Sequence, residues 1–227
     1  MRREFPRLAH LVAGLLAAGT LACSGTTEPE PTPPKVYPQG TPEQLVQSFV
    51  ESYEDRNIAE YSKLFAGDFT FEFSNAADPN LVAHYASGWH RIDEITAASR
   101  LFHGGTNSDG VYQESASRIT VGLPDSIPEP DTTRGDSAYA YRIVHTPAIL
   151  TVEVPGDIVY VIPAVPPQPH WIYLVRGDFA AGLTPDQPAD SAHWYIYHWK
   201  DESGPLKRFT TSMNSSSTWG RLKALYR

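Results

Sequence analysis

Cysteine is nearly absent from this chain, because its 227 residues include only Cys23. A single cysteine cannot form an internal disulfide, so the stability of the fold must come from its packed core. The sequence also lacks a Gly-rich phosphate loop, a Gly-x-Ser-x-Gly turn and His spacings typical of metal ligands. We therefore expect no metal and no cofactor.

Basic residues are also scarce: 18 Lys and Arg stand against 26 Asp and Glu, and the formal charge is −8. No basic run is present. An acidic surface is repelled by nucleic-acid phosphates and by anionic lipid headgroups. We therefore do not expect nucleic acid as a partner. Binding to a membrane would require an attachment other than electrostatic attraction to its lipids.

Residues 1–22 have the pattern of an export signal, because three arginines precede an apolar run, 8–21, that is too short to span a membrane. The stretch from Thr20 to Cys23 (TLAC) resembles the lipobox of bacterial lipoproteins, although a leucine is usual where Thr20 stands. This resemblance implies that Cys23 is acylated and anchors the chain to the cell envelope, at the outer membrane if the host has one. An ordinary signal-peptidase site that leaves a free thiol is the alternative.

The next segment, 23–40, contains the lipidation cysteine and a stretch rich in Pro, Thr and Glu. Such a composition offers almost nothing to bury, so we expect a disordered tether. The remainder, 41–227, has the length of a single folded domain.

Two amphipathic helices are predicted at the start of this domain. Thr41 suits the cap position, Pro42 the first turn, and Gln44 completes a capping box. Apolar residues then recur at helical spacing as far as Tyr53, and a second helix is expected over 58–65.

The pattern then changes to strands. Phe69, Phe71 and Phe73 alternate with polar residues, which predicts a strand with an aromatic inner face. A third helix is expected between residues 89 and 102. Further strand patterns cover 113–123, 138–154, 157–163, 170–176 and 192–200. Helices followed by strands indicate an α+β domain with helices on one face of a mostly antiparallel sheet.

This order of elements resembles the NTF2-like (SnoaL-like) superfamily over residues 41–200. The resemblance implies a cone in which three N-terminal helices pack on a curved sheet, with a pocket at its mouth. It also implies a second copy of the chain as a candidate partner, because many members are dimers. The tail contains Trp219, Leu222 and Tyr226, which we expect to dock on the domain as a C-terminal arm.

Within that superfamily, residues 48–73 resemble the ketosteroid isomerases. Those enzymes use a tyrosine on the first helix and an aspartate on the first strand, and the matching positions here are Phe49 and Phe73. A phenyl ring neither donates nor accepts a proton, so the resemblance argues against this chemistry. Tyr53, one turn beyond Phe49, is the nearest polar alternative.

The last strands offer two further candidates for acid–base or anion-binding roles, His198 and Arg176, which lie on otherwise apolar strand faces. Strict alternation places Tyr195, Tyr197 and Trp199 on the opposite face from Trp194, Ile196 and His198. A core role for His198 and a salt bridge for Arg176 are the simpler interpretations. The residues expected to line a pocket are Phe49, Tyr53, Phe71, Phe73, Trp89, Trp194, Ile196 and His198.

Three functional hypotheses follow. The leading one is a non-catalytic module at the cell envelope that binds an apolar small molecule or another protein. The alternative is a cofactor-free isomerase or lyase, similar to polyketide cyclases, that uses Tyr53, His198 or Arg176. A third is that the cone is filled by its own side chains and the protein acts through its surface.

Overall fold

The structure is a computed structural model that describes residues 35–75, 79–156, 158–162, 169–202, 214–216 and 218–227. Residues 36–227 form one compact unit. The expected signal and the lipidation cysteine, Cys23, lie outside the described residues. Within the described residues, every helix is too short or too polar to cross a bilayer.

Two helices open the domain as predicted. Helix α1 (Pro42–Glu54) is capped by the Thr41 hydroxyl, which accepts a hydrogen bond from the Gln44 backbone at 3.2 Å. The Gln44 side chain accepts from the backbone of Gly40 at 3.1 Å, one residue before the position that a capping box would use. Helix α2 (Ile58–Lys63) ends earlier than predicted, because the following residues lead directly into the first strand.

That first strand, β1 (Phe65–Glu72), is longer than predicted but has the expected aromatic face. Phe69, Phe71 and Phe73 are buried, whereas Thr70 and Glu72 point the other way. A short helix that the sequence pattern missed, α3 (Pro79–His84), comes next. The predicted third helix is α4 (Arg91–His103), preceded by the two-residue strand β2 (Trp89–His90).

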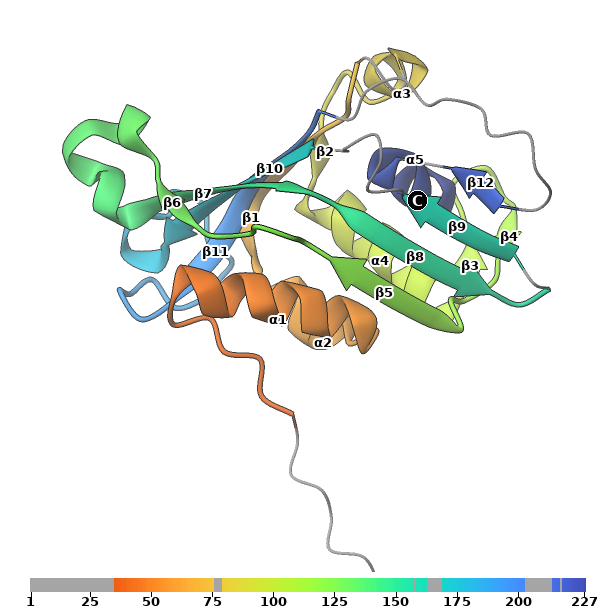
Figure 1. Cartoon of the computed structure of the whole chain (residues 1–227), viewed down its shortest axis with the longest axis horizontal. Helices are drawn as coiled ribbons and strands as arrows, with labels where there is room; N and C mark the ends of the chain where they lie inside the picture. Colours follow the sequence, from red (N-terminus) through yellow and green to blue (C-terminus); the bar gives the residue numbers. More distant parts are fainter. Residues whose placement is uncertain (1–34, 76–78, 157, 163–168, 203–213, 217) are drawn as a thin grey trace, which may run out of the picture. The chain divides into compact units, whose positions relative to one another are not determined.

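The strands form two main sheets (Figure 1). The first has the order β2-β1-β11-β10-β7-β6, and among its described strands β1 and β11 are parallel while the other neighbours are antiparallel. The second has the order β12-β9-β8-β5. The bounds of these strands are β5 (Arg118–Gly122), β6 (Glu129–Pro130), β7 (Tyr141–Pro147), β8 (Ile149–Val154), β9 (Ile158–Ile162), β10 (Pro169–Arg176), β11 (Trp194–Asp201) and β12 (Asn214–Ser216).

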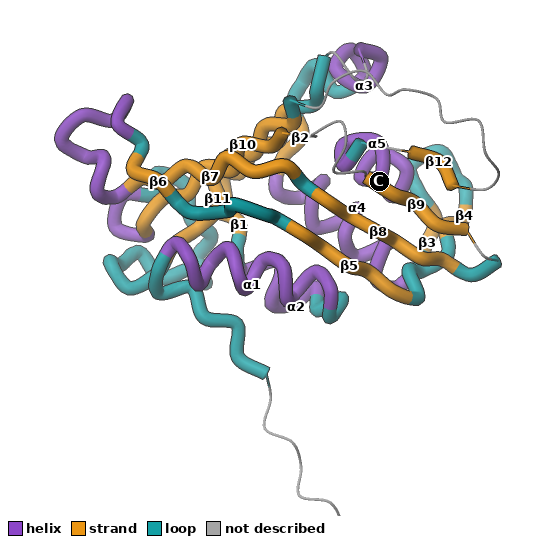
Figure 2. Tube along the Cα trace, in the orientation of Figure 1, coloured by secondary structure: helices purple, strands orange, loops and turns teal. Residues whose placement is uncertain are grey.

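One extended segment joins the two sheets. The sequence predicts a single strand over 138–154, and the structure divides this stretch into the 3₁₀ helix η1 (Thr132–Ala140), β7 and β8. Only the buried Ala148 separates β7 from β8, so the chain bends there and passes from the first sheet to the second (Figure 2). Two smaller elements complete the strands, a hairpin of β3 (Gly105–Thr106) and β4 (Tyr112–Gln113).

The predicted class, α+β with helices on a mostly antiparallel sheet, is confirmed by these elements. The strict alternation predicted for the last strand is wrong beyond Tyr197. The pairing of β10 with β11 shifts register there, so Trp199 joins Trp194 and Ile196 in the main core. His198 lies instead on the face of β1 that carries Thr70, whose hydroxyl is 2.8 Å from its ring Nδ1.

The chain ends in helix α5 (Trp219–Tyr226), which packs beside α4. Trp219, Leu222 and Tyr226 are all buried in the main core. Gly220 permits this approach, because a Cβ atom there would lie 2.8 Å from the Phe73 ring. The last helix therefore supplies core side chains to the space between the other helices and the first sheet.

Candidate functional site

A buried ion pair lies in this interior. Helix α4 contributes Glu94 and helix α5 contributes Lys223, and their charged atoms are 2.7 Å apart. Only 2% and 3% of these side chains are exposed. Glu94 also accepts hydrogen bonds from Tyr61 at 2.7 Å and from Trp89 at 3.1 Å. The carboxylate thus has two hydrogen-bond donors and an ammonium beside it, and such partners are what a buried charge needs to be tolerated.

Aromatic rings enclose the Lys223 ammonium. Its nitrogen lies 3.8 Å from the ring centroids of both Phe71 and Trp199, which is cation–π geometry. Burial lowers the pKa of Lys223 to about 8, against the opposing effect of Glu94. The ammonium form therefore still predominates at neutral pH.

A buried histidine lies beside these rings. Nδ1 of His170 accepts a hydrogen bond from the Trp199 indole at 3.0 Å, so the neutral ring carries its proton on Nε2. Among the described residues, Nε2 has no hydrogen-bond partner. Burial, together with the charge of Lys223, lowers the pKa of His170 to about 4, although Asp201 opposes this shift. His170 is therefore uncharged at neutral pH.

An open cavity of about 630 Å³ lies at the edge of this interior, and we call it the mouth cleft. Its apolar surface includes Phe71, Phe73 and Tyr85, the last of which stacks on Phe73 with ring centroids 4.9 Å apart. Its polar border contains the carboxylates of Glu72, Asp201 and Glu202 and the ammonium of Lys200.

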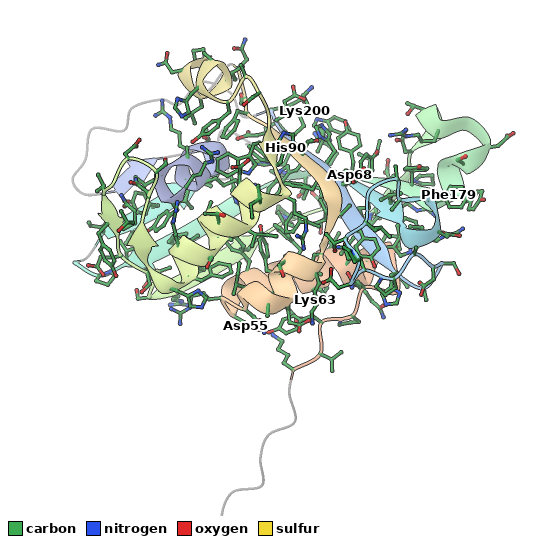
Figure 3. The ribbon with its side chains drawn as sticks, turned by 180° about the vertical axis from the view of Figure 1, so that it is seen from behind. Asp55, Lys63, Asp68, His90, Phe179 and Lys200 are labelled. Carbon is green, nitrogen blue, oxygen red and sulfur yellow. The ribbon has the colours of Figure 1, made fainter. Side chains whose placement is uncertain are left out.

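The mouth cleft lies at one end of the first sheet, where β1 and β11 meet α3. Lys200 and His90 are at this end (Figure 3). Phe71 belongs to both regions, because it borders the cleft and also contacts Lys223. The cleft and the buried ion pair are therefore separated by the thickness of one aromatic side chain.

The three catalytic candidates from the sequence do not come together. Tyr53 is 2% exposed inside the core, where burial and then Glu94 raise its pKa well above the ordinary value. His198 is on the outer face of the sheet, and burial lowers its pKa. Arg176 forms a two-point ion pair with Asp178, at 2.6 and 2.9 Å, which raises its pKa. No single substrate position is adjacent to all three.

The residues expected to line a pocket divide in the same way. Phe71 and Phe73 border the mouth cleft. His198 lies on the outer face of the sheet. The other five are in the main core and do not border the cleft: Phe49, Tyr53, Trp89, Trp194 and Ile196.

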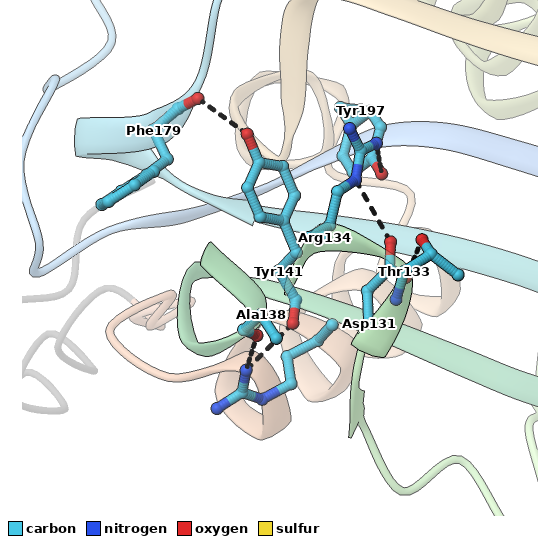
Figure 4. Close-up of polar contacts among 8 residues, drawn as sticks. Asp131, Thr133, Arg134, Ala138, Tyr141, Phe179 and Tyr197 are labelled. Atoms are coloured by element: carbon cyan, nitrogen blue, oxygen red, sulfur yellow. Dashed lines mark hydrogen bonds and ion pairs between the residues drawn. The ribbon is translucent and has the colours of Figure 1, made fainter. Parts of the chain in front are cut away.

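A second polar cluster lies on the outer face of the first sheet (Figure 4). Arg134 donates to the Tyr197 hydroxyl at 2.8 Å, pairs with Asp131 at 3.3 Å and covers the Tyr141 ring at 4.6 Å. The Tyr141 hydroxyl donates to the backbone carbonyl of Phe179 at 3.3 Å. These contacts fasten η1 to the first sheet.

Sequence reasoning missed the residues that define the interior. Glu94 has only the sequence pattern of a solvated helical turn, and the expected C-terminal arm rested on Trp219, Leu222 and Tyr226 without Lys223. One signal was present: Trp219, Lys223 and Tyr226 recur at helical spacing, which puts a lysine on the buried face of α5. In the described residues, no group of three or more His, Cys, Asp or Glu side chains is arranged to hold a metal ion.

No family model and no curated protein sequence matches the chain. Solved structures similar to it include an NTF2-like superfamily protein of Salmonella enterica, at 12% identity and a TM-score of 0.42, covering 74% of this chain and 90% of that one. A second is an NTF2-like protein of unknown function in nutrient uptake from Rhodospirillum rubrum, at 10% identity and 0.41, covering 71% and 93%. A third is a candidate scytalone dehydratase of Novosphingobium aromaticivorans, at 9% and 0.44, covering 74% and 91%.

Two of these structures are named NTF2-like, as is the superfamily that the sequence resembles. All three have TM-scores below 0.5 and identities of 12% or less, so they carry no argument about this chain. The site must be interpreted from its own residues.

Proposed function

We propose that the protein is a non-catalytic module that binds a small apolar molecule in the mouth cleft. The observation that carries this proposal is the cleft itself. Its volume of about 630 Å³ is in the range of small-molecule sites, and Phe71, Phe73 and Tyr85 offer an apolar surface to a ligand. The interior behind it is occupied by Trp219 and Lys223, so a ligand is expected at the mouth and not within the core.

The charged groups of the cleft favour holding a ligand over proton transfer. Lys200 and Glu202 are 2.7 Å apart, and each stabilises the ionised form of the other. Glu202 raises the pKa of Lys200, and Lys200 lowers the pKa of Glu202. A general acid or base works best when its pKa is near the working pH, and this pair is shifted away from neutrality.

We further propose that Cys23 is lipidated and that the tether after it presents the module at the cell envelope. The support for this location is the sequence of residues 1–23. Cys23 is the chain's single cysteine and has no second cysteine with which to form an internal disulfide. This is consistent with a thiol that is acylated and serves as an anchor. The end of the expected tether, 23–40, belongs to the domain instead, because Tyr37 is buried and donates to Asp55 at 2.9 Å and the Gln39 carbonyl accepts from the Trp194 backbone at 2.9 Å.

A cofactor-free isomerase or lyase is the second candidate function. The observation in its favour is the buried cluster of Tyr61, Glu94 and Lys223, in which Lys223 has a pKa of about 8. Such a group could exchange protons near neutrality. The ammonium is only 3% exposed and already paired, which is why binding is the leading proposal.

Native mass spectrometry of the purified full chain tests both functions. Val82→Trp should fill the cleft, because Val82 lines it, whereas Ile158→Trp on the surface of β9 is the matched control. We expect the wild type and Ile158→Trp to retain a small molecule that Val82→Trp loses. Equal retention by all three proteins would refute the site.

The retained compound then distinguishes the two functions. Incubation with fresh wild-type protein should leave its mass and chromatographic behaviour unchanged if the protein only binds. Conversion that disappears in a Lys223→Met protein that is still folded and still retains the compound would establish the enzyme instead.

A further inference from the structure

A second cleft lies on the outer face of the first sheet, and we call it the side cleft. Its volume of about 460 Å³ is in the range of small-molecule sites. Strands β7 and β10 contribute Ile143, His145 and Trp171 to its floor, and residues 125–133, which include β6 and the start of η1, form its opposite wall. Among the described residues, the side cleft shares no lining residue with the mouth cleft.

The floor of the side cleft carries a flat aromatic surface. His145 and Trp171 are cross-strand partners, and their rings stack with centroids 4.0 Å apart and planes inclined by 17°. Glu202 holds the indole in place, because it accepts a hydrogen bond from Nε1 of Trp171 at 2.7 Å. Ile127, which is 74% exposed, adds an apolar side chain from the opposite wall. A rigid pair of rings gives a ligand a large contact area at a small entropic cost.

The polar groups of the side cleft are mainly hydrogen-bond acceptors. None of its described lining residues is a lysine or an arginine. Asp125 and Glu129 are exposed, and neither side chain has a partner among the described residues. Asp131 is already occupied, because it accepts from Thr133 and pairs with Arg134 at 3.3 Å. A ligand must therefore bring donors, and a phosphate, sulfate or carboxylate group would be repelled.

Exposed carboxylates select hydrogen-bond donors more strongly than they select charge. An ion pair in contact with solvent contributes little, because water and salt screen it. A hydroxyl group that donates to a carboxylate forms one of the stronger hydrogen bonds. A pyranose ring with equatorial substituents has hydroxyl donors around its rim and apolar C–H groups on its two faces. Such a ring matches a flat aromatic floor with acceptors beside it.

We propose that the side cleft binds a neutral, β-linked saccharide with equatorially substituted pyranose rings. One ring lies on the aromatic pair of His145 and Trp171, and its hydroxyls donate to Asp125 and Glu129. This site is additional to the mouth cleft, and the inference does not depend on the proposed function.

Cellobiose is the probe, because it is neutral and both of its rings have this shape. In nitrogen-15 NMR titrations of the full chain, the Trp171 indole N–H reports the site, and its signal is assigned by its loss in Trp171→Phe. We expect a saturable shift at millimolar cellobiose, with the same dissociation constant at low salt and in 0.5 M salt, because no charge is on the ligand. Butylammonium, which brings a charge but no hydroxyls, should bind at least about tenfold more weakly.

Two variants test the two halves of the site, with the backbone amide of His145 as the reporter. Trp171→Ala should weaken cellobiose binding at least about tenfold. Asp125→Asn/Glu129→Gln should weaken it at least about fivefold, because an amide oxygen accepts less strongly than a carboxylate. Asparagine suits the left-handed backbone of Asp125, whose φ is 58°, so this variant should keep its fold. Tyr112→Ala removes a 60% exposed ring on β4 and is the matched control, with unchanged affinity expected.

The contrary outcomes are distinct. Absence of any shift with cellobiose would overturn the inference, and so would unchanged affinity in either variant. Tighter binding of butylammonium than of cellobiose would show that the acids select a cation and would overturn the saccharide assignment. Val82→Trp, which fills the mouth cleft, should bind cellobiose like the wild type. Loss of cellobiose binding in that variant would place the saccharide in the mouth cleft and overturn the side cleft as its site.

Discussion

The buried ion pair gives the sharpest prediction, which concerns Lys223→Met. Methionine keeps most of the volume of the lysine side chain and removes its charge, so Glu94 is left without a cation in a site that is 2% exposed. Removing one partner of a buried pair typically costs about 3–5 kcal/mol. Glu94 keeps two donors, Tyr61 and Trp89, which reduces the penalty. We therefore expect a loss of about 3 kcal/mol in the free energy of unfolding.

A double-mutant cycle isolates the electrostatic part of this loss. In Lys223→Met/Glu94→Gln the remaining partner is neutral and can still accept from Tyr61, so at least about 1.5 kcal/mol should be recovered relative to Lys223→Met. The matched control is Lys63→Met. Lys63 pairs with Glu60 at 2.6 Å but is 54% exposed, and its loss should cost less than about 0.5 kcal/mol.

Urea unfolding followed by tryptophan fluorescence measures all of these variants, because Trp89, Trp199 and Trp219 surround the pair. A loss below about 1 kcal/mol for Lys223→Met would show that water or side-chain rearrangement compensates Glu94. If the effects of Lys223→Met and Glu94→Gln on the free energy of unfolding simply add, the two charges do not interact. Either result would contradict the structural interpretation of this interior.

Two further predictions concern the same region. The first concerns His170, whose pKa is about 6.5 in the unfolded chain and about 4 in the folded protein. Between these pH values the unfolded state binds more protons, so the free energy of unfolding falls as the pH drops from 6.5 to 4. The free energy of unfolding of His170→Gln should fall by up to about 3 kcal/mol less than that of the wild type over this pH range, as measured by urea midpoints at each pH. Parallel profiles for the two proteins would contradict the lowered pKa of His170. For Gly220, alanine gains helix propensity of about 1 kcal/mol, but its Cβ would meet the Phe73 ring at 2.8 Å, so Gly220→Ala should be destabilising by about 1–2 kcal/mol net. Thermal unfolding decides this, and an unchanged or raised Tm would mean that the ring moves aside without cost.

Local patterns in the sequence predicted most of the fold. The Thr41 cap of α1, the alternation of Phe69, Phe71 and Phe73, and the helical spacing in α4 depend on neighbours within a few residues. The prediction failed where a contact between distant segments decides the outcome. The register shift between β10 and β11, which turns His198 outward and Trp199 inward, depends on strand pairing and leaves no periodic signal in either strand.

The candidate site was harder to predict for the same reason. Tyr53 and His198 were selected because each is polar on an apolar face, and such a rule cannot distinguish core, cleft and outer surface. Glu94 and Lys223 are 129 positions apart in the chain. The segment around each residue, considered alone, has the composition of a solvated helix. Only the packing of α5 against α4 makes them a pair.

The last helix also explains why a binding site should lie at the mouth and not in the interior. Trp219 fills space among Phe49, Tyr53 and Trp199, with ring centroids 6.1, 5.6 and 4.9 Å away. The Lys223 ammonium occupies the space beside the Glu94 carboxylate. Apolar residues in place of this ion pair would often be as stable or more so, which means that the pair is weak evidence for a purely stabilising role. Its position directly behind Phe71 gives it a second effect, because a charge held there fixes the ring that borders the cleft. Lys223→Met should therefore change ligand affinity at the cleft through Phe71, even though Lys223 does not line it.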